Sequence, residues 1–122
     1  MPIKVVVFNN SSLSFVELEM KAAGFLSHAT DLTETDFSKL AEAIGILGLR
    51  AERPEQVKAL LSQALEHEGP ALVDVIVNRQ ELAMPPTITL EQIKGFTLYM
   101  VKAVLNGKGD EVVDLAKTNL FA

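Results

Sequence analysis

Residues 3–8 read IKVVVF, a nearly continuous apolar run in which β-branched side chains dominate. A strand with one solvated face alternates apolar and polar residues, whereas a strand buried on both faces of a parallel sheet is apolar almost throughout. Residues 71–77, ALVDVIV, repeat this pattern after the break at Gly69-Pro70. The two runs therefore predict two core strands of a parallel sheet.

The chain between these two runs predicts helices and one more strand. Residues 15–23 and 36–45 carry helix formers or apolar residues at helical spacing, and each stretch is followed or ended by glycine. Residues 46–51 predict a modest strand, and Pro54 opens a further helix at its first turn. The order β-α-α-β-α-β indicates an α/β fold with three layers, a parallel sheet with helices on both faces.

The character of the sequence changes after residue 83. Met84-Pro85-Pro86 predicts an extended hinge, and helical patterns resume over residues 90–105 and about 110–120. We therefore expect an α/β body over residues 1–83 and a C-terminal helical arm over residues 84–122.

Composition excludes several classes of function. The 122 residues carry a net charge of −5 with dispersed basic side chains, so we expect no nucleic acid partner. The absence of cysteine excludes disulfides, thiolate metal sites and thiol nucleophiles. No export signal or membrane span is visible in the sequence, and a cytoplasmic location fits this composition.

Asn9 and Asn10 end the first predicted strand, at the edge where open α/β sheets bind ligands. One interpretation is that the pair caps a turn before a helix. The other is that an amide oxygen and a backbone carbonyl bind Mg²⁺ beside a phosphate, which also requires a carboxylate. Asp31, Asp36 and Asp74 are better interpreted as loop, helix-cap and strand residues. The residues alone leave the activity open.

The stretch VVVFNN at residues 5–10 resembles the end of the cofactor motif of thiamine diphosphate enzymes. Further segments follow in the order of that family: Asp36-Phe37 with Leu40-Ala41 and Gly45, then GPALVDV at 69–75 and ELAMPP at 81–86. The continuation through GFTLYM at 95–100, GDE at 109–111 and LAKTN at 115–119 resembles the pyruvate oxidases and quinone-linked pyruvate dehydrogenases. The resemblance covers essentially this whole chain, but only the C-terminal part of such an enzyme.

The resemblance implies roles for the residues that follow the first strand. Asn10 would bind Mg²⁺ through its side chain, and Ser12 would bind it through its backbone carbonyl. The residues expected to contact the cofactor and the active site are Asn10, Leu13, Ser14, Phe15 and Val16. Among these, Phe15 and Val16 are the residues expected at the reacting centre, with Phe15 near thiamine and flavin.

Two departures from the family limit what this chain can do alone. Ser14 stands where close relatives carry glycine, which affects how closely the backbone approaches the phosphates. No Gly-Asp-Gly motif precedes Ile3, so the acidic Mg²⁺ ligand is absent. We therefore expect an inactive piece whose partner is the missing N-terminal part of the enzyme, within a homo-oligomer.

The implied reaction is oxidative decarboxylation of pyruvate with thiamine diphosphate, Mg²⁺ and FAD, followed by electron transfer to a membrane quinone. The resemblance also implies that the arm contacts membrane lipid at the inner face of the cell membrane, through an apolar surface that includes Val112, Val113 and Leu115. The alternative is an arm folded on its own core. Two other functions stay open: another thiamine diphosphate enzyme, such as acetolactate synthase, and a stand-alone binding module without catalysis.

Overall fold

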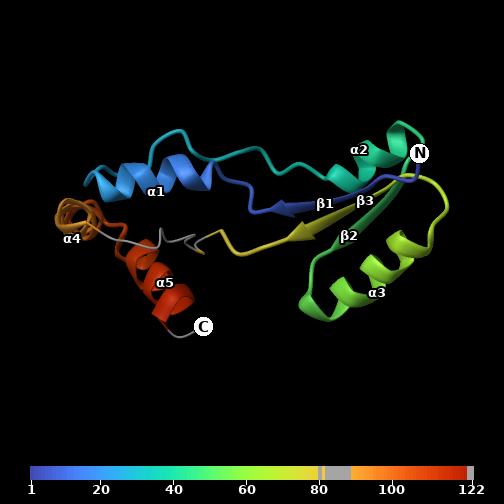
Figure 1. Ribbon diagram of the computed structural model, residues 1–122. Coiled ribbons are helices and arrows are strands. Elements are labelled where there is room, and N and C mark those ends of the chain that lie inside the picture. The colour runs from blue at the N-terminus through green and yellow to red at the C-terminus, as the bar shows by residue number, and fades with distance from the viewer. Residues whose placement is uncertain (80, 82–88, 121–122) are drawn as a thin grey trace. The chain divides into compact units, whose positions relative to one another are not determined.

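The computed structural model describes residues 1–79, 81 and 89–120. Its elements are β1 (Lys4–Asn9), α1 (Ser14–Ala22), α2 (Phe37–Ala43), β2 (Leu47–Ala51), α3 (Pro54–Glu66), β3 (Ala71–Ile76), α4 (Leu90–Leu105) and α5 (Gly109–Leu120) (Figure 1). The chain divides into unit 1, residues 1–11 and 33–78, and unit 2, residues 12–32 with the chain from residue 79 on. The expected boundary at residues 83–84 and the hinge at 84–86 lie outside the described residues.

Unit 1 is built on three parallel strands in the order β1-β3-β2. Successive residues of β3 point to opposite faces of this sheet. Val73 and Val75 pack towards α3, whereas the carboxylate of Asp74 accepts a hydrogen bond from the backbone N–H of Phe37, the first residue of α2. Figure 1 shows the two helices on opposite faces of the sheet. The predicted α/β fold with helices on both faces of a parallel sheet is confirmed.

The buried core of unit 1 lies between the sheet and α3. It consists of small and β-branched side chains, namely Ala51, Ala64, Ala71, Val73 and Val75. On the other face, α2 approaches β2 so closely that the Ser38 backbone occupies the space a Cβ on Gly48 would need. Glycine at this position therefore allows the helix to lie directly on the strand.

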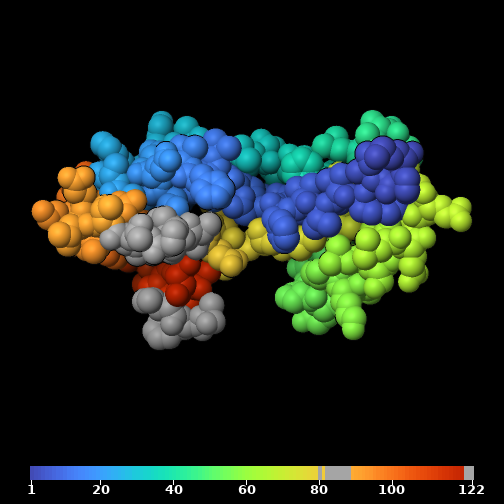
Figure 2. All heavy atoms as spheres, in the orientation of Figure 1, coloured from blue at the N-terminus to red at the C-terminus, as the bar shows by residue number. Residues whose placement is uncertain are grey.

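The surroundings of β1 differ from the prediction made for residues 3–8. Val5, Val6 and Phe8 are 43%, 42% and 74% exposed, and Figure 2 shows the dark blue atoms of this strand open towards the viewer. The prediction that the strand is buried on both faces is therefore wrong for this chain. The physical reason is that β1 is an edge strand, whereas α2 and α3 pack mainly on β2 and β3.

Unit 2 is formed by α1, α4 and α5. Gly95 of α4 lies against the backbone of Ala22 at the end of α1, where any side chain would clash. The buried cluster of unit 2 comprises Tyr99, Ala103 and Leu115, with Leu26 and Val112 packed against it. Leu115 and Val112, which were expected to face lipid, therefore pack inside unit 2. No helix in the described ranges is long and apolar enough to cross a bilayer.

Candidate functional site

The six candidate site residues lie in the connection from β1 to α1 and in the first turn of α1. This connection leaves the strand after Asn9 and enters the helix at Ser14, and the division between the two units falls between Ser11 and Ser12. Ser11 has a φ of 53°, in the left-handed region that residues other than glycine seldom adopt. Such a backbone conformation persists only where surrounding contacts hold it.

The two asparagines at the end of β1 have different surroundings. Asn9 is buried, its Nδ2 donates to the carbonyl oxygen of Thr35 at 2.9 Å, and its Oδ1 accepts from the Ser11 backbone N–H at 3.2 Å. Asn9 therefore holds the turn, as one of the two interpretations of the pair requires. Asn10 is only half-buried, and it is the asparagine expected to bind Mg²⁺.

The start of α1 combines exposed side chains with the lack of a side-chain cap in the described part of the chain. Its N-cap residue is Leu13, which provides no side-chain cap, and the N–H groups of a first helical turn have no acceptor within the helix. Leu13, Phe15 and Val16 are 44%, 70% and 47% exposed, and Ser14 is partly buried. An uncapped helix start carries partial positive charge and suits a phosphate group.

A buried polar network connects the end of the β1–α1 connection to α1; this connection, residues 10–13, is called the β1–α1 turn below. Ser12 Oγ donates to Glu17 Oε2 at 2.9 Å, and Glu17 Oε1 is 2.7 Å from Lys21 Nζ. Burial acts to raise the pKa of Glu17, but the hydrogen bond and charge of Lys21, with Ser12 and Arg79, outweigh it, so this pKa is lowered. The sequence analysis missed this pair because Glu and Lys four residues apart are typical of an exposed helix face.

A second segment of unit 2 holds the turn from its other side. The Leu13 backbone N–H donates to the Thr30 carbonyl oxygen at 2.9 Å, and Ser12 forms an isolated antiparallel bridge with Asp31. The guanidinium of Arg79 pairs with the Asp31 carboxylate and also lies 3.5 Å from Glu17 Oε2. Residues 12 and 13 are therefore tied to residues 30 and 31 by backbone and side-chain contacts.

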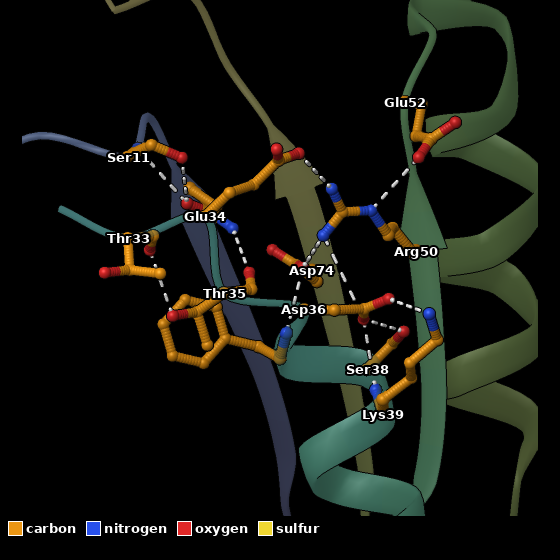
Figure 3. Close-up of polar contacts among 12 residues, drawn as sticks. Ser11, Thr33, Glu34, Thr35, Asp36, Ser38, Lys39, Arg50, Glu52 and Asp74 are labelled. Atoms are coloured by element: carbon orange, nitrogen blue, oxygen red, sulfur yellow. Dashed lines mark hydrogen bonds and ion pairs between the residues drawn. The ribbon is translucent and has the colours of Figure 1, made fainter.

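A separate charged cluster lies near the carboxyl end of the sheet in unit 1 (Figure 3). Arg50 Nη1 is 2.8 Å from Asp74 Oδ2, and the same guanidinium pairs with Glu52 at 3.2 Å and Glu34 at 3.5 Å. Asp74 is fully buried, and its Oδ2 also accepts from the Phe37 backbone N–H at 3.2 Å. This cluster joins the start of α2 to β2 and β3, so we assign it a structural role.

Asp36 caps α2, as the sequence analysis expected for this position. Its Oδ1 accepts from the Ser38 hydroxyl at 2.6 Å and from the Lys39 backbone N–H at 3.1 Å. These hydrogen bonds, the one from Ser38 above all, lower the pKa of Asp36 to about 2. The interpretations of Asp36 as a cap and of Asp74 as a strand residue are confirmed.

The residues of the turn fit part of a magnesium site. The Asn10 side chain and the Ser12 backbone offer two neutral oxygen ligands of the kind Mg²⁺ accepts. Within residues 1–79, 81 and 89–120, no three His, Cys, Asp or Glu side chains gather in a way that could hold a metal ion. The nearest carboxylate in sequence, Glu17, is bound to Ser12 and Lys21, and Asp31 is paired with Arg79.

Comparisons with known proteins point to one family. Residues 1–75 match the family described as thiamine pyrophosphate enzyme, C-terminal TPP binding domain. YdaP of Bacillus subtilis, named as a candidate thiamine pyrophosphate-containing protein, is 32% identical over 118 residues, which cover 97% of this chain and 20% of YdaP.

Acetolactate synthases are also similar to this chain. The enzyme of Bacillus subtilis is 35% identical over 77 residues, or 63% of this chain and 14% of that protein. The mitochondrial catalytic subunit of Saccharomyces cerevisiae is 32% identical over 87 residues, or 69% of this chain and 12% of that protein. The chain therefore spans a fifth or less of the length of these relatives.

Proposed function

This chain belongs to the thiamine pyrophosphate enzymes, as a C-terminal cofactor-binding domain of that family, and on this premise we propose that it forms one part of the site for thiamine diphosphate and Mg²⁺. The observation that carries the proposal is the β1–α1 turn. There the half-buried Asn10 and the tightly held Ser12 are followed at once by the uncapped start of α1. These are oxygen ligands for a hard cation next to N–H donors for phosphate.

The proposed roles of these residues concern binding and orientation. Thiamine diphosphate, when bound, supplies the carbon chemistry. Asn10 and Ser12 would bind the metal ion through the side-chain amide oxygen and the backbone carbonyl. The N–H groups of Ser14 and its neighbours would receive the phosphates. Phe15 and Val16 are exposed at the start of α1, so their side chains are accessible for apolar contact with the cofactor.

For the parent activity we propose an FAD-linked oxidoreductase that decarboxylates pyruvate and reduces a quinone. The support is the C-terminal arm, whose sequence resembles that enzyme type. The match to YdaP covers 97% of this chain, whereas the matches to the two acetolactate synthases cover 63% and 69%. Acetolactate synthase is the second candidate, because several named relatives carry that activity. An assay of the complete protein with pyruvate distinguishes the two activities. Acetolactate synthase forms acetolactate, whereas the oxidoreductase reduces an electron acceptor.

We also propose that polypeptide outside this chain completes the site, in the same protein or in a partner, and that the whole assembles as a homo-oligomer. One observation that supports this proposal is that apolar side chains of β1 are exposed, since another polypeptide could cover them. The described residues gather no cluster of acidic side chains that could hold a metal ion, which supports the same idea, since two neutral oxygens poorly offset the charge of a diphosphate. The intact mass of the gene product in its own cell would identify that polypeptide.

The direct test is calorimetry with thiamine diphosphate, with and without Mg²⁺. We expect no measurable Mg²⁺-dependent binding by the 122-residue chain alone at micromolar concentrations, and clear binding by the complete protein. In the complete protein, Asn10→Ala should weaken Mg²⁺ and cofactor retention, while Asn106→Ala, at the exposed end of α4, should not. Equal losses in the two variants would remove Asn10 from the site. Absence of binding by the complete protein would refute the proposed function.

A further inference from the structure

Glu17 and Lys21 form an ion pair that is buried within unit 2. The two residues are only 6% and 2% exposed, and their charged atoms lie 2.7 Å apart. Burying both charges costs desolvation energy that offsets most of their attraction, and apolar residues of similar size often replace such pairs without loss of stability. Stability alone therefore does not explain the pair, and its geometry points to another role.

The carboxylate of Glu17 is held at both of its oxygens. Oε1 accepts from Lys21, whose Nζ also lies 5.4 Å from the centre of the fully buried Tyr99 ring. Oε2 accepts from the Ser12 hydroxyl at 2.9 Å and lies 3.5 Å from the Arg79 guanidinium. A carboxylate held in this way offers the Ser12 hydroxyl an acceptor in one fixed place.

We propose that Glu17, held by Lys21, is a positioning residue that fixes the backbone of Ser12 and with it the β1–α1 turn. The part of this proposal that concerns cofactor binding rests on the proposed function, in which the Ser12 carbonyl binds Mg²⁺. The preceding residue, Ser11, has a φ of 53°, so the turn depends on its contacts to keep its shape. Mg²⁺ requires nearly ideal octahedral geometry, and small rotations of the Ser12 peptide would therefore weaken its binding.

The proposal gives the Ser12 side chain a function of its own. A residue that ligates only through its backbone carbonyl should tolerate loss of its hydroxyl. The structure indicates the opposite for Ser12, because this hydroxyl is buried and donates to Glu17, with the Thr30 carbonyl oxygen as a weaker second acceptor at 3.4 Å. Ser12→Ala is therefore the most informative substitution in the turn.

Ser38 provides a matched control for that substitution. Ser12 and Ser38 are 7% and 8% exposed, and each hydroxyl donates to a carboxylate, at 2.9 Å to Glu17 and at 2.6 Å to Asp36. Ser12→Ala and Ser38→Ala thus remove the same group from equally buried positions, and only Ser12 lies in the turn. Ser12→Thr keeps a hydroxyl at this position and should therefore behave like the wild type.

The first measurement needs no cofactor. Hydrogen exchange of the Leu13 amide reports on the turn, because this N–H donates to the Thr30 carbonyl oxygen at 2.9 Å. We expect Ser12→Ala to accelerate exchange at Leu13 by roughly tenfold, while Ser38→Ala and Ser12→Thr leave it near the wild-type rate. If Ser12→Ala does not fold, Ser12→Cys, whose thiol is a weaker hydrogen-bond donor to Glu17, should accelerate the same exchange by roughly threefold. Unchanged exchange at Leu13, or equal acceleration in Ser12→Ala and Ser38→Ala, overturns the positioning role.

The second measurement uses the complete protein, and determines the Mg²⁺ concentration that half-saturates retention of thiamine diphosphate. We expect Ser12→Ala to raise it by roughly tenfold, with a thermal midpoint like that of Ser38→Ala. If Leu13 exchange responds but the Mg²⁺ requirement does not, the network has no role in cofactor binding and the proposal fails. If the wild type retains no cofactor, the proposed function fails, and exchange at Leu13 alone decides whether Glu17 positions the turn.

Discussion

β1 and β3 are neighbouring six-residue strands with similar apolar sequences and opposite surroundings. In β3, Val73 is 1% exposed and Asp74 is fully buried, whereas in β1, Val6 is 42% and Phe8 74% exposed. Position in the sheet explains the difference, because β3 lies between two strands and under two helices, and β1 lies at the edge. The apolar composition of a strand thus indicates that it is suited to be buried. It does not indicate whether segments of the same chain bury it.

Within the described residues, the edge at β1 has little of the usual protection of edge strands. Such strands in soluble proteins are commonly short, charged or covered, which prevents pairing with other chains. Lys4 is the one charged residue among the six of β1, and its ammonium donates to the carbonyl oxygens of His67 and Gly69 beyond the end of α3. β1 therefore has the character of an interior strand in a larger sheet.

The largest expected effect comes from one substitution made in both strands. Val6 and Val73 are partners in the β1–β3 register, so Val6→Asn and Val73→Asn place the same polar group at matched positions. Val73→Asn buries an amide in the core and should lower the free energy of unfolding by about 3 kcal/mol. Val6→Asn should cost less than about 1 kcal/mol. Urea unfolding of both variants measures this, and equal losses would show that the two strands do not differ.

A smaller effect is expected on self-association. The open edge and faces of β1 lead us to expect that the chain associates through this strand at high micromolar concentrations. Phe8→Lys should weaken association about tenfold, because it places a charge at the proposed contact. Leu65→Lys is the control, since Phe8 and Leu65 are 74% and 70% exposed on different elements of unit 1. Sedimentation that shows a monomeric wild type, or equal effects of both variants, would contradict association through β1.

Local sequence patterns were sufficient to predict the elements of unit 1. Continuous β-branched runs gave β1 and β3, helical spacing and the cap at Asp36 gave α2, and Pro54 gave the start of α3. The alternation of these elements then predicted the parallel sheet. The exposure of β1 could not be predicted, because exposure depends on which segments of the chain cover a strand.

The candidate site was predicted less completely. Resemblance to the family predicted roles for Asn10 and for Ser12 to Val16, and these residues lie in the connection from β1 to α1 and in the first turn of α1. It could not identify Glu17 and Lys21, because their spacing is the same as that of a surface pair. Their burial arises from α4, which packs on α1 at Gly95 and places Tyr99 over Lys21. Such a contact between distant segments leaves no local signal.

The next prediction concerns lipid binding by the C-terminal arm, which belongs to unit 2, and its expected effect is weaker. Leu115 and Val112 pack on Tyr99, so the apolar surface left for lipid on α5 includes Val113, which is 50% exposed. Residues 108–122 contain two lysines against three acidic residues, and electrostatic attraction to anionic lipid is therefore small. We predict weak lipid binding with little salt dependence, measured by liposome flotation with and without residues 108–122. If both forms float equally, the arm has no lipid role.

The smallest expected effect is a pH dependence of the stability of unit 1. It tests whether Asp36, the N-cap of α2, stabilises the helix that packs on β2 and β3. The pKa of Asp36 is lowered to about 2 from its ordinary value of 3.8. A group whose pKa is lowered in the folded state stabilises that state above its unfolded pKa, and loses this contribution as the pH falls through the folded pKa. The stabilisation by Asp36 should therefore be complete above about pH 4 and should disappear towards pH 2.

Asp36→Ser is the suitable variant, because serine can still cap the helix but does not titrate in this range. The thermal midpoint of the wild type should exceed that of Asp36→Ser near pH 6, and the difference should shrink as the pH is lowered from 4 to 2. Because Asp36 also lies 3.9 Å from Arg50 in a partly buried ion pair, the difference reports this pair together with the hydrogen bonds from Ser38 and Lys39. A difference that stays constant from pH 6 to pH 2 would show that the charge of Asp36 does not stabilise α2.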